Sequence, residues 1–314
     1  MPDRLTRHAG DIFGPIAYSD TAYLLDATHA WVAETGHGAA FGGGLYIATF
    51  RTTDGGKTWH DGAAVAGVSP TLFFLDENHG WLLQSAHDTP ANLYSTDDAG
   101  LHWNFTSSAA WTGGLFTSVL AVTFSSLTTG WISATDGSLW VTHDGGVTWQ
   151  VQPLPITPDA DGGITPPRFF DPQHGLISAW VSSASPAVLL VTSDGGTTWI
   201  VRSLPWEHAF EIDFADADHG WAIAGPGDIF DAPAAALPLP LYKTDDGGQT
   251  WAPVQTNILL RTPGDGVIGP FHFVDRNNGF MVRYASQSNG YTQWLKTTDG
   301  GRTWTVVVEA PQTP

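Results

Sequence analysis

One nine-residue pattern recurs six times along this chain. The copies read RTTDGGKTW (51–59), STDDAGLHW (95–103), VTHDGGVTW (141–149), VTSDGGTTW (191–199), KTDDGGQTW (243–251) and KTTDGGRTW (296–304). The closing tryptophans of successive copies are 44, 46, 50, 52 and 53 residues apart. A repeat of this length is typical of architectures in which each unit packs against its neighbours to bury a shared core.

A second pattern precedes every copy of the first. It reads LLDATHAW (24–31), FLDENHGW (74–81), FSSLTTGW (124–131), FFDPQHGL (169–176), FADADHGW (214–221) and FVDRNNGF (273–280). Apolar runs of about four to six residues alternate with Gly- and Asp-containing turns, which is typical of short β-strands. The Ala-rich stretch 231–238 contains Pro233 and Pro238, and these disfavour a long helix there.

Six units of four strands predict a single all-β domain, a β-propeller of six four-stranded blades. We expect residues 1–17 to precede the first blade and to add a closing strand to the last. Seven blades, the alternative, would require sequence beyond these six units. The predicted blades span about 18–62, 63–106, 107–153, 154–204, 205–255 and 256–310.

Each letter of the nine-residue pattern has an expected role in folding. The Asp side chain can accept hydrogen bonds from N–H groups of its own turn. The second Gly, Gly56 in the first copy, can take a positive φ, and Trp59 is expected to pack inward. We therefore predict structural roles for Asp54, Asp98, Asp144, Asp194, Asp246 and Asp299.

The nine-residue pattern resembles the Asp-box, or BNR repeat. Five copies match the form S/T-x-D-x-G-x-T-W, and the second has His102 in place of the last Thr. Its pairing with F-x-D-x-x-H-G-W is most similar to the Ycf48-like group of photosystem II assembly factors. The resemblance covers residues 20–308 and implies a propeller with each box on the hairpin between the third and fourth strands, at the rim. Asp-boxes also occur in sialidases, the sortilin family and xyloglucan-active glycoside hydrolases, so the resemblance specifies fold more closely than function.

Charge and composition limit the possible partners. With 31 acidic residues against 12 Lys and Arg, the net charge of −19 argues against nucleic acid and anionic membranes. There is no cysteine for disulfides or thiolate metal sites, and no apolar run approaches the ~18 residues of a membrane span. We predict a monomer without metal or cofactor that binds a protein or glycan ligand.

The location of the protein is left open by its first residues. MPDRLTRHAG lacks the apolar core of a signal peptide. An extracytoplasmic or secreted protein whose leader is absent from this chain is the favoured interpretation. A cytoplasmic protein is the alternative.

Candidate catalytic residues lie outside the repeats. Glycoside hydrolysis requires two carboxyl groups, about 5–5.5 or 6.5–9.5 Å apart. In PWEHAFEID (205–213), Glu207 and Glu211 lie beside Trp206 and His208, which joins acids to an imidazole and an aromatic platform for a sugar. The alternative is a solvated loop anchored by one tryptophan. The F/Y-R-I-P motif of sialidases is absent.

Binding residues are expected on the links between blades. The long links 104–118, 152–167 and 254–270 should gather on one face, here called the loop face. We favour a non-enzymatic binding or scaffold propeller that recognises its ligand through this face. The alternative is a glycoside hydrolase, sialidase-like or polysaccharide-active, that uses Glu207 and Glu211. The candidate ligand-binding residues are Trp111, Arg168, Trp206, His208, Arg261 and His272.

Overall fold

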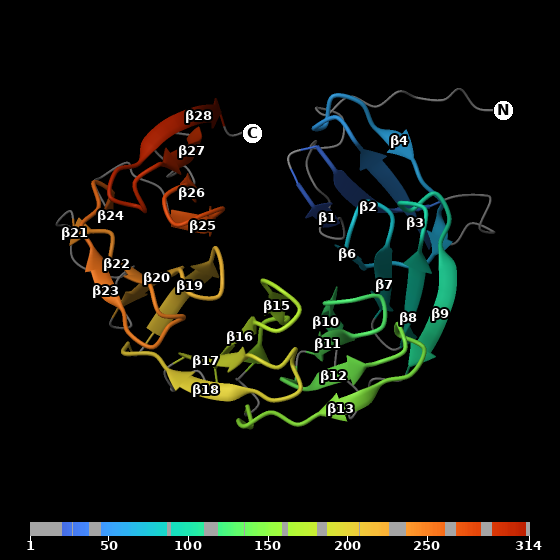
Figure 1. Cartoon of the computed structure of the whole chain (residues 1–314). Coiled ribbons are helices and arrows are strands. Elements are labelled where there is room, and N and C mark those ends of the chain that lie inside the picture. Colours follow the sequence, from blue (N-terminus) through green and yellow to red (C-terminus); the bar gives the residue numbers. More distant parts are fainter. Residues whose placement is uncertain are drawn as a thin grey trace. The chain divides into compact units, whose positions relative to one another are not determined.

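The fold class is the predicted one, an all-β propeller of six four-stranded blades. Every element assigned in the computed structural model is a β-strand (Figure 1). The chain divides into two compact units, 1–172 and 173–314. The predicted closing strand within residues 1–17 lies outside the described residues. The structure describes residues 21–26, 28–37, 45–86, 89–109, 119–134, 136–158, 163–180, 187–206, 208–225, 237–260, 268–283 and 291–311.

The first unit holds three antiparallel blades in which neighbouring strands pair in chain order. The first blade is β1 (Thr21–Leu24), β2 (Ala30–His37), β3 (Leu45–Thr52) and β4 (His60–Asp61), with β5 (Val65–Ala66) also paired to β3. The second is β6 (Pro70–Phe74), β7 (Gly80–Ala86), β8 (Thr89–Thr96) and β9 (Asn104–Ala109). The third is β10 (Val119–Phe124), β11 (Gly130–Ala134), β12 (Leu139–Thr142) and β13 (Gln150–Gln152). The unit ends with β14 (Gly163–Ile164) and β15 (Arg168–Phe169).

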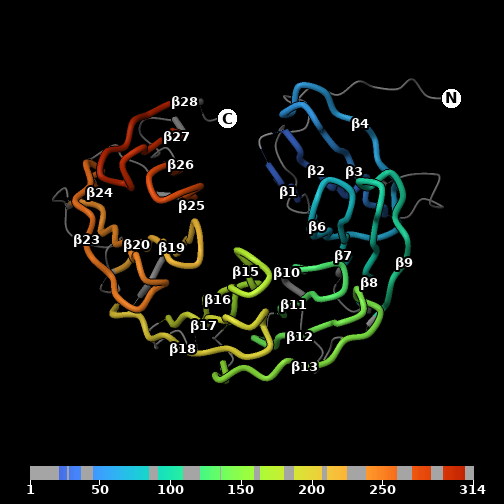
Figure 2. The backbone as a smooth tube through the Cα atoms, viewed as in Figure 1, coloured from blue at the N-terminus to red at the C-terminus, as the bar shows by residue number. Residues whose placement is uncertain are grey.

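The second unit continues the same up-and-down order, and Figure 2 traces its backbone. The fourth blade contributes β16 (Gly175–Trp180), β17 (Ala187–Thr192) and β18 (Ile200–Ser203). The fifth is β19 (His208–Phe214), β20 (Gly220–Gly225), β22 (Leu241–Thr244) and β23 (Ala252–Val254). The sixth is β25 (Ile268–Phe273), β26 (Gly279–Arg283), β27 (Tyr291–Thr297) and β28 (Thr305–Pro311). Two short strands, β21 (Leu237–Pro238) and β24 (Leu259–Leu260), pair with each other.

The carboxylate of each box Asp accepts hydrogen bonds from residues of its own hairpin. In the first box, Asp54 Oδ1 accepts hydrogen bonds from the backbone N–H of Thr58 at 3.0 Å and from Thr52 Oγ1 at 2.9 Å. Asp54 Oδ2 accepts from Thr58 Oγ1 at 2.7 Å. These bonds, led by that of the Thr58 hydroxyl, lower the pKa of Asp54 to about 2. Gly56 has a φ of 84°, a conformation that glycine adopts readily.

The same arrangement recurs in the other boxes. Thr148, Thr198, Thr250 and Thr303 each donate a backbone N–H and a hydroxyl to the Asp four residues earlier. In the second box His102 takes the place of Thr, and its Nδ1 lies 2.6 Å from Asp98 Oδ2. The box carboxylates therefore organise their turns.

An aromatic stack joins neighbouring blades. The Trp221 ring of β20 lies 3.6 Å from the Phe273 ring of β25 at an angle of 2°, and its N–H donates to the Gly300 carbonyl oxygen at 3.1 Å. Gly300 follows the box Asp of the sixth blade. We call this unit of two rings and one hydrogen bond the cross-blade stack. It recurs as Trp31 on Phe74, with the Ala99 carbonyl, and as Trp81 on Phe124, with the Gly145 carbonyl.

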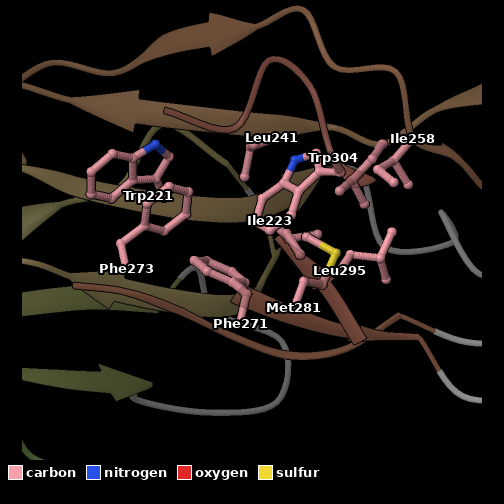
Figure 3. Packing of buried hydrophobic residues seen from close by; sticks show 10 residues of the cluster. Trp221, Ile223, Leu241, Ile258, Phe271, Phe273, Met281, Leu295 and Trp304 are labelled. Carbon is pink, nitrogen blue, oxygen red and sulfur yellow. The ribbon is translucent and has the colours of Figure 1, made fainter. Parts of the chain in front are cut away.

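Figure 3 shows the core that surrounds one cross-blade stack. Ile223 and Leu241 of the fifth blade face Phe271, Met281 and other residues of the sixth, and every side chain of this cluster is at most 4% exposed. Gly279 is also required, because a Cβ there would lie 2.8 Å from the Phe273 ring. The small residue, the two rings and the box hairpin form one packed assembly.

We predict that Phe273→Ala lowers the free energy of unfolding by about 3–5 kcal/mol, because it leaves a cavity beneath Trp221. Phe273 is 0% exposed. Urea denaturation followed by tryptophan fluorescence measures the change. Val306→Ala on β28, where Val306 is 45% exposed, is the control and should have a small effect. Equal losses in the two variants would contradict the role given to the stack.

Candidate functional site

The first strands of the blades carry a position that differs in every unit. It is the residue directly before the Phe or Leu that opens the second pattern. Because the surrounding residues repeat and this one does not, it is a place where individual function can be built without disturbing the repeat. Its occupants are Tyr23, Phe73, Thr123, Arg168, Asp213 and His272.

In the second unit this position brings an acid and an imidazole together. Asp213 of β19 is 7% exposed, and its Oδ2 accepts a hydrogen bond from the backbone N–H of Phe273 at 2.7 Å. The same oxygen lies 3.2 Å from Nδ1 of His272 on β25, whose side chain is 56% exposed. An Asp at Nδ1 favours the tautomer that is protonated there, which leaves Nε2 as a hydrogen-bond acceptor.

A second carboxyl group lies on the same face of β19. Glu211 precedes Asp213 by two residues, and residues two apart on a strand point to the same side. Burial, together with the negative charge of Asp213, raises the pKa of Glu211 above its ordinary value. Glu211 is only partly exposed. The site therefore combines a carboxyl group that holds its proton more tightly with an imidazole that a buried carboxylate orients.

This arrangement can bind hydrogen-bond donors and can exchange protons. An ionised Glu211 and the Nε2 atom of His272 both accept hydrogen bonds, so they suit a ligand with hydroxyl, ammonium or guanidinium groups. Shifted pKa values and oriented imidazoles are also frequent in catalytic sites. Geometry alone thus permits both a binding site and an acid–base site.

The structure adds Asp213 to the residues that the sequence singled out. Glu211 and His272 were separate candidates, 61 positions apart in the chain, and Asp213 connects their strands. The sequence did carry a signal, since Asp213 places a charge where Phe73 and Thr123 stand in other units. Only the contact between blades reveals what that charge does.

Trp206, between β18 and β19, packs against the fifth blade. Its ring is 4.6 Å from the Tyr242 ring and 5.2 Å from the Trp251 ring, and the residue is partly buried. It therefore anchors residues 205 and 206 to the blade, and part of its surface stays accessible.

The remaining candidates are more scattered. Arg168 of β15 lies in the first unit, with its guanidinium carbon 5.6 Å from the centre of the Phe170 ring. Glu207, Trp111 and Arg261 lie outside the described residues. His208 begins β19, but its side chain is not described.

Two absences hold for the described part of the chain. No group of three or more His, Cys, Asp or Glu side chains is placed there to hold a metal ion. No helix there is long and apolar enough to cross a membrane.

Comparison with known proteins supports the fold. The family model described as BNR/Asp-box repeat matches residues 50–61, the first box and its flanks. No curated protein sequence matches the chain. The structure of YCF48 bound to D1 peptide is 18% identical with a TM-score of 0.53, covering 93% of this chain and 86% of that one. YCF48 from Cyanidioschyzon merolae is 18% identical with a TM-score of 0.54, covering 94% and 86%.

A structure described as an enzyme has a similar fold. The GH74 enzyme of Niastella koreensis is 14% identical with a TM-score of 0.53, and the match covers 90% of this chain and 57% of that one. At such identities the likeness concerns the fold alone. The Asp-box repeat and the propeller fold that the repeats indicated are confirmed, and YCF48 is among the proteins of similar fold.

We predict that Glu211→Gln stabilises the protein at pH 8 and has little effect at pH 4. A raised pKa means that the folded state binds the Glu211 proton more tightly than the unfolded state. Stability is therefore lost as pH rises from the ordinary Glu value through the raised one, and Gln removes that loss. Thermal unfolding at both pH values measures the effect, with Glu77→Gln as the control for lost charge. A larger gain at pH 4 than at pH 8 would contradict the assignment.

Proposed function

We propose that this protein is a non-enzymatic binding or scaffold propeller that recognises a protein or glycan ligand through its loop face. The observation that carries the proposal is the state of Asp213, the carboxylate on the same face of β19 as Glu211. It is 7% exposed and engaged by the Phe273 N–H and by His272. A glycosidase of the usual kind requires a second carboxylate free to act as nucleophile or base. Asp213 instead contacts the Phe273 N–H and His272, and so joins the fifth blade to the sixth.

The box aspartates also have a structural role, because they accept hydrogen bonds within their own turns. Each accepts two bonds from the residue four positions on, except Asp98, which accepts one backbone N–H and lies beside the His102 ring. Lowered pKa values accompany these bonds in all six boxes. The repeated acids are therefore poor general acids, which need a pKa nearer the working pH. A binding function requires no role for them beyond folding.

The candidate ligand contacts suit a partner rich in donors. Glu211 is the middle residue of β19, the strand that follows the link from the fourth blade. Its carboxylate and His272 Nε2 accept hydrogen bonds, and the net charge of −19 favours approach of cationic or neutral ligands. The peptide held by YCF48 in one similar structure is consistent with a protein ligand. A monomeric state and an extracytoplasmic or secreted location belong to the same proposal.

One observation favours a glycoside hydrolase as the second candidate. The pKa of Glu211 is raised by burial and by Asp213, as a general acid requires. In that case Glu211 protonates the leaving oxygen, and the GH74 enzyme of similar fold provides an analogy. Glu207, the partner that the sequence offered, lies outside the described residues.

A parallel screen for turnover and for binding tests the proposal. Chromogenic glycosides, sialosides and plant polysaccharides are assayed for hydrolysis, and peptide and glycan arrays for binding. We expect no hydrolysis, and binding that Glu211→Gln weakens about tenfold or more, since a hydrogen bond to a charged group contributes about 1.5–3 kcal/mol. Glu77→Gln, which removes the same charge from an exposed turn of the first unit, should bind as the unmodified chain does.

Turnover that disappears in Glu211→Gln would contradict the binding proposal and favour the hydrolase. Binding that is equally strong in both variants would retain the general function but remove Glu211 from the site.

A further inference from the structure

Each cross-blade stack has a receiving site on the blade that the tryptophan covers. In the second blade the centre of the Trp31 ring lies 3.7 Å from that of the Phe74 ring, and the indole N–H donates to the Ala99 carbonyl oxygen at 2.9 Å. The third and sixth blades receive Trp81 and Trp221 in the same way. A receiving site thus consists of an apolar side chain at the first position of the second pattern and the carbonyl oxygen of the residue after the box Asp.

The fifth blade shows that this carbonyl finds a donor even without a tryptophan. Leu176 stands in the fourth blade where other blades carry the Trp, so no indole N–H is supplied from that position. The Arg202 guanidinium of β18 donates instead to the Gly247 carbonyl oxygen, which follows the box Asp of the fifth blade. The second, third, fifth and sixth blades therefore all have this acceptor paired.

The first blade has the same receiving site, and there it is open. Leu24 holds the apolar position and is 72% exposed. Gly55 follows the box Asp, is exposed, and its carbonyl oxygen has no donor among the described residues. Both residues line a groove of ≈190 Å³, together with Ala22, Ala30 and Trp59 among others. The groove therefore combines an apolar surface with an unused hydrogen-bond acceptor.

The box hairpin beside the groove is fully formed. Gly55 has a φ of 75°, close to the 77° of Gly145 and the 71° of Gly300, and Asp54 accepts the usual bonds from its turn. Trp59 is 7% exposed, yet its N–H has no acceptor among the described residues. A buried N–H without an acceptor is uncommon in folded proteins, so the packing around this groove is incomplete.

The size and charge of the groove indicate what it can hold. Its volume lies below the roughly 300–1,000 Å³ of pockets for drug-sized ligands, so it suits a single side chain. Asp26 also lines the groove. The hydrogen bonds that Asp26 accepts, led by the one from the Thr28 backbone, lower its pKa, so it is ionised at neutral pH. Its charge and the net charge of −19 favour a basic residue beside the inserted side chain.

We propose that the groove of the first blade binds a tryptophan side chain of a partner protein, presented by a segment that also carries Lys or Arg. The indole ring lies on Leu24 and its N–H donates to the Gly55 carbonyl oxygen, as in the cross-blade stack, while the basic residue pairs with Asp26. Phenylalanine has no donor for that carbonyl, so tryptophan is preferred. This site lies in the first unit and the one around Glu211 in the second, so either can exist without the other.

A thiol-exchange experiment tests the proposal and detects weak contacts. The chain has no cysteine, and Ala22, which lines the groove, is exposed, so Ala22→Cys introduces one thiol there. The variant is equilibrated with the peptides Cys-Gly-Lys-Trp and Cys-Gly-Lys-Ala in a thiol–disulfide buffer, and mass spectrometry counts each mixed disulfide. We expect about tenfold more of the Trp peptide, because it gains an apolar contact and a hydrogen bond. Methylation of the indole nitrogen, or Glu in place of Lys, should lower that yield.

Three further variants make the result specific to the groove. Leu24→Ser with Ala22→Cys removes the apolar surface and should abolish the preference, and the exposure of Leu24 makes loss of the fold unexpected. Ile200→Cys, 62% exposed on β18, reports non-specific attraction and should show no preference. Glu211→Gln with Ala22→Cys should keep the full preference, which separates this site from the one proposed above.

Equal yields of the Trp and Ala peptides on Ala22→Cys would overturn the proposal, and so would a preference that survives Leu24→Ser. An Ala22→Cys thiol that reacts with neither peptide would also overturn it, since another part of the chain would then cover the groove.

Discussion

The cross-blade stack is the interaction on which the rest of the structure depends. One Trp ring lies on the Phe ring of the next blade, and its N–H bonds to the carbonyl after the next box Asp. This requires a glycine beside the Phe ring, as Gly279 lies beside Phe273, and it requires a box hairpin that presents the carbonyl in a fixed direction. The Asp and Thr side chains fix that direction because the hydrogen bonds between them hold the turn in one conformation. The repeated residues of both patterns thus belong to one structural unit, and their repetition reflects packing.

Function must then use positions that the stack leaves free. The residue before the opening Phe is one of them, and it shows how a structural contact can become a site. In the first blade this residue is Tyr23, which hydrogen-bonds to the backbone of Phe74 and whose pKa burial raises to about 12, so it stays neutral. In the fifth blade Asp213 makes the equivalent bond to Phe273 with a charged group. That charge orients His272, and it adds to the burial that raises the pKa of Glu211. A charged residue within a structural contact thus orients one neighbouring side chain and adds to the pKa shift of another.

Much of the fold could be predicted from the sequence because its determinants are local. The box turns, the strands around them and the inward tryptophans are encoded within a few residues of each other, as in 141–149. Only some residues of the candidate site could be predicted. Glu211 and His272 stand out as off-pattern residues, but Asp213 acts across a separation of 60 residues that no local pattern reports. An anchoring role for Trp206 was one alternative, but its partners Tyr242 and Trp251 could not be predicted, since they lie far along the chain.

The central claim is that the repeats build the fold and that the first strands carry the function. Hydrogen–deuterium exchange of the protein with and without a ligand found on the arrays tests it most directly. The account predicts added protection in β19 and β25, around Glu211 and His272, with no change in the box hairpins 244–251 and 297–304. Protection confined to those hairpins, with β19 and β25 unchanged, would contradict it.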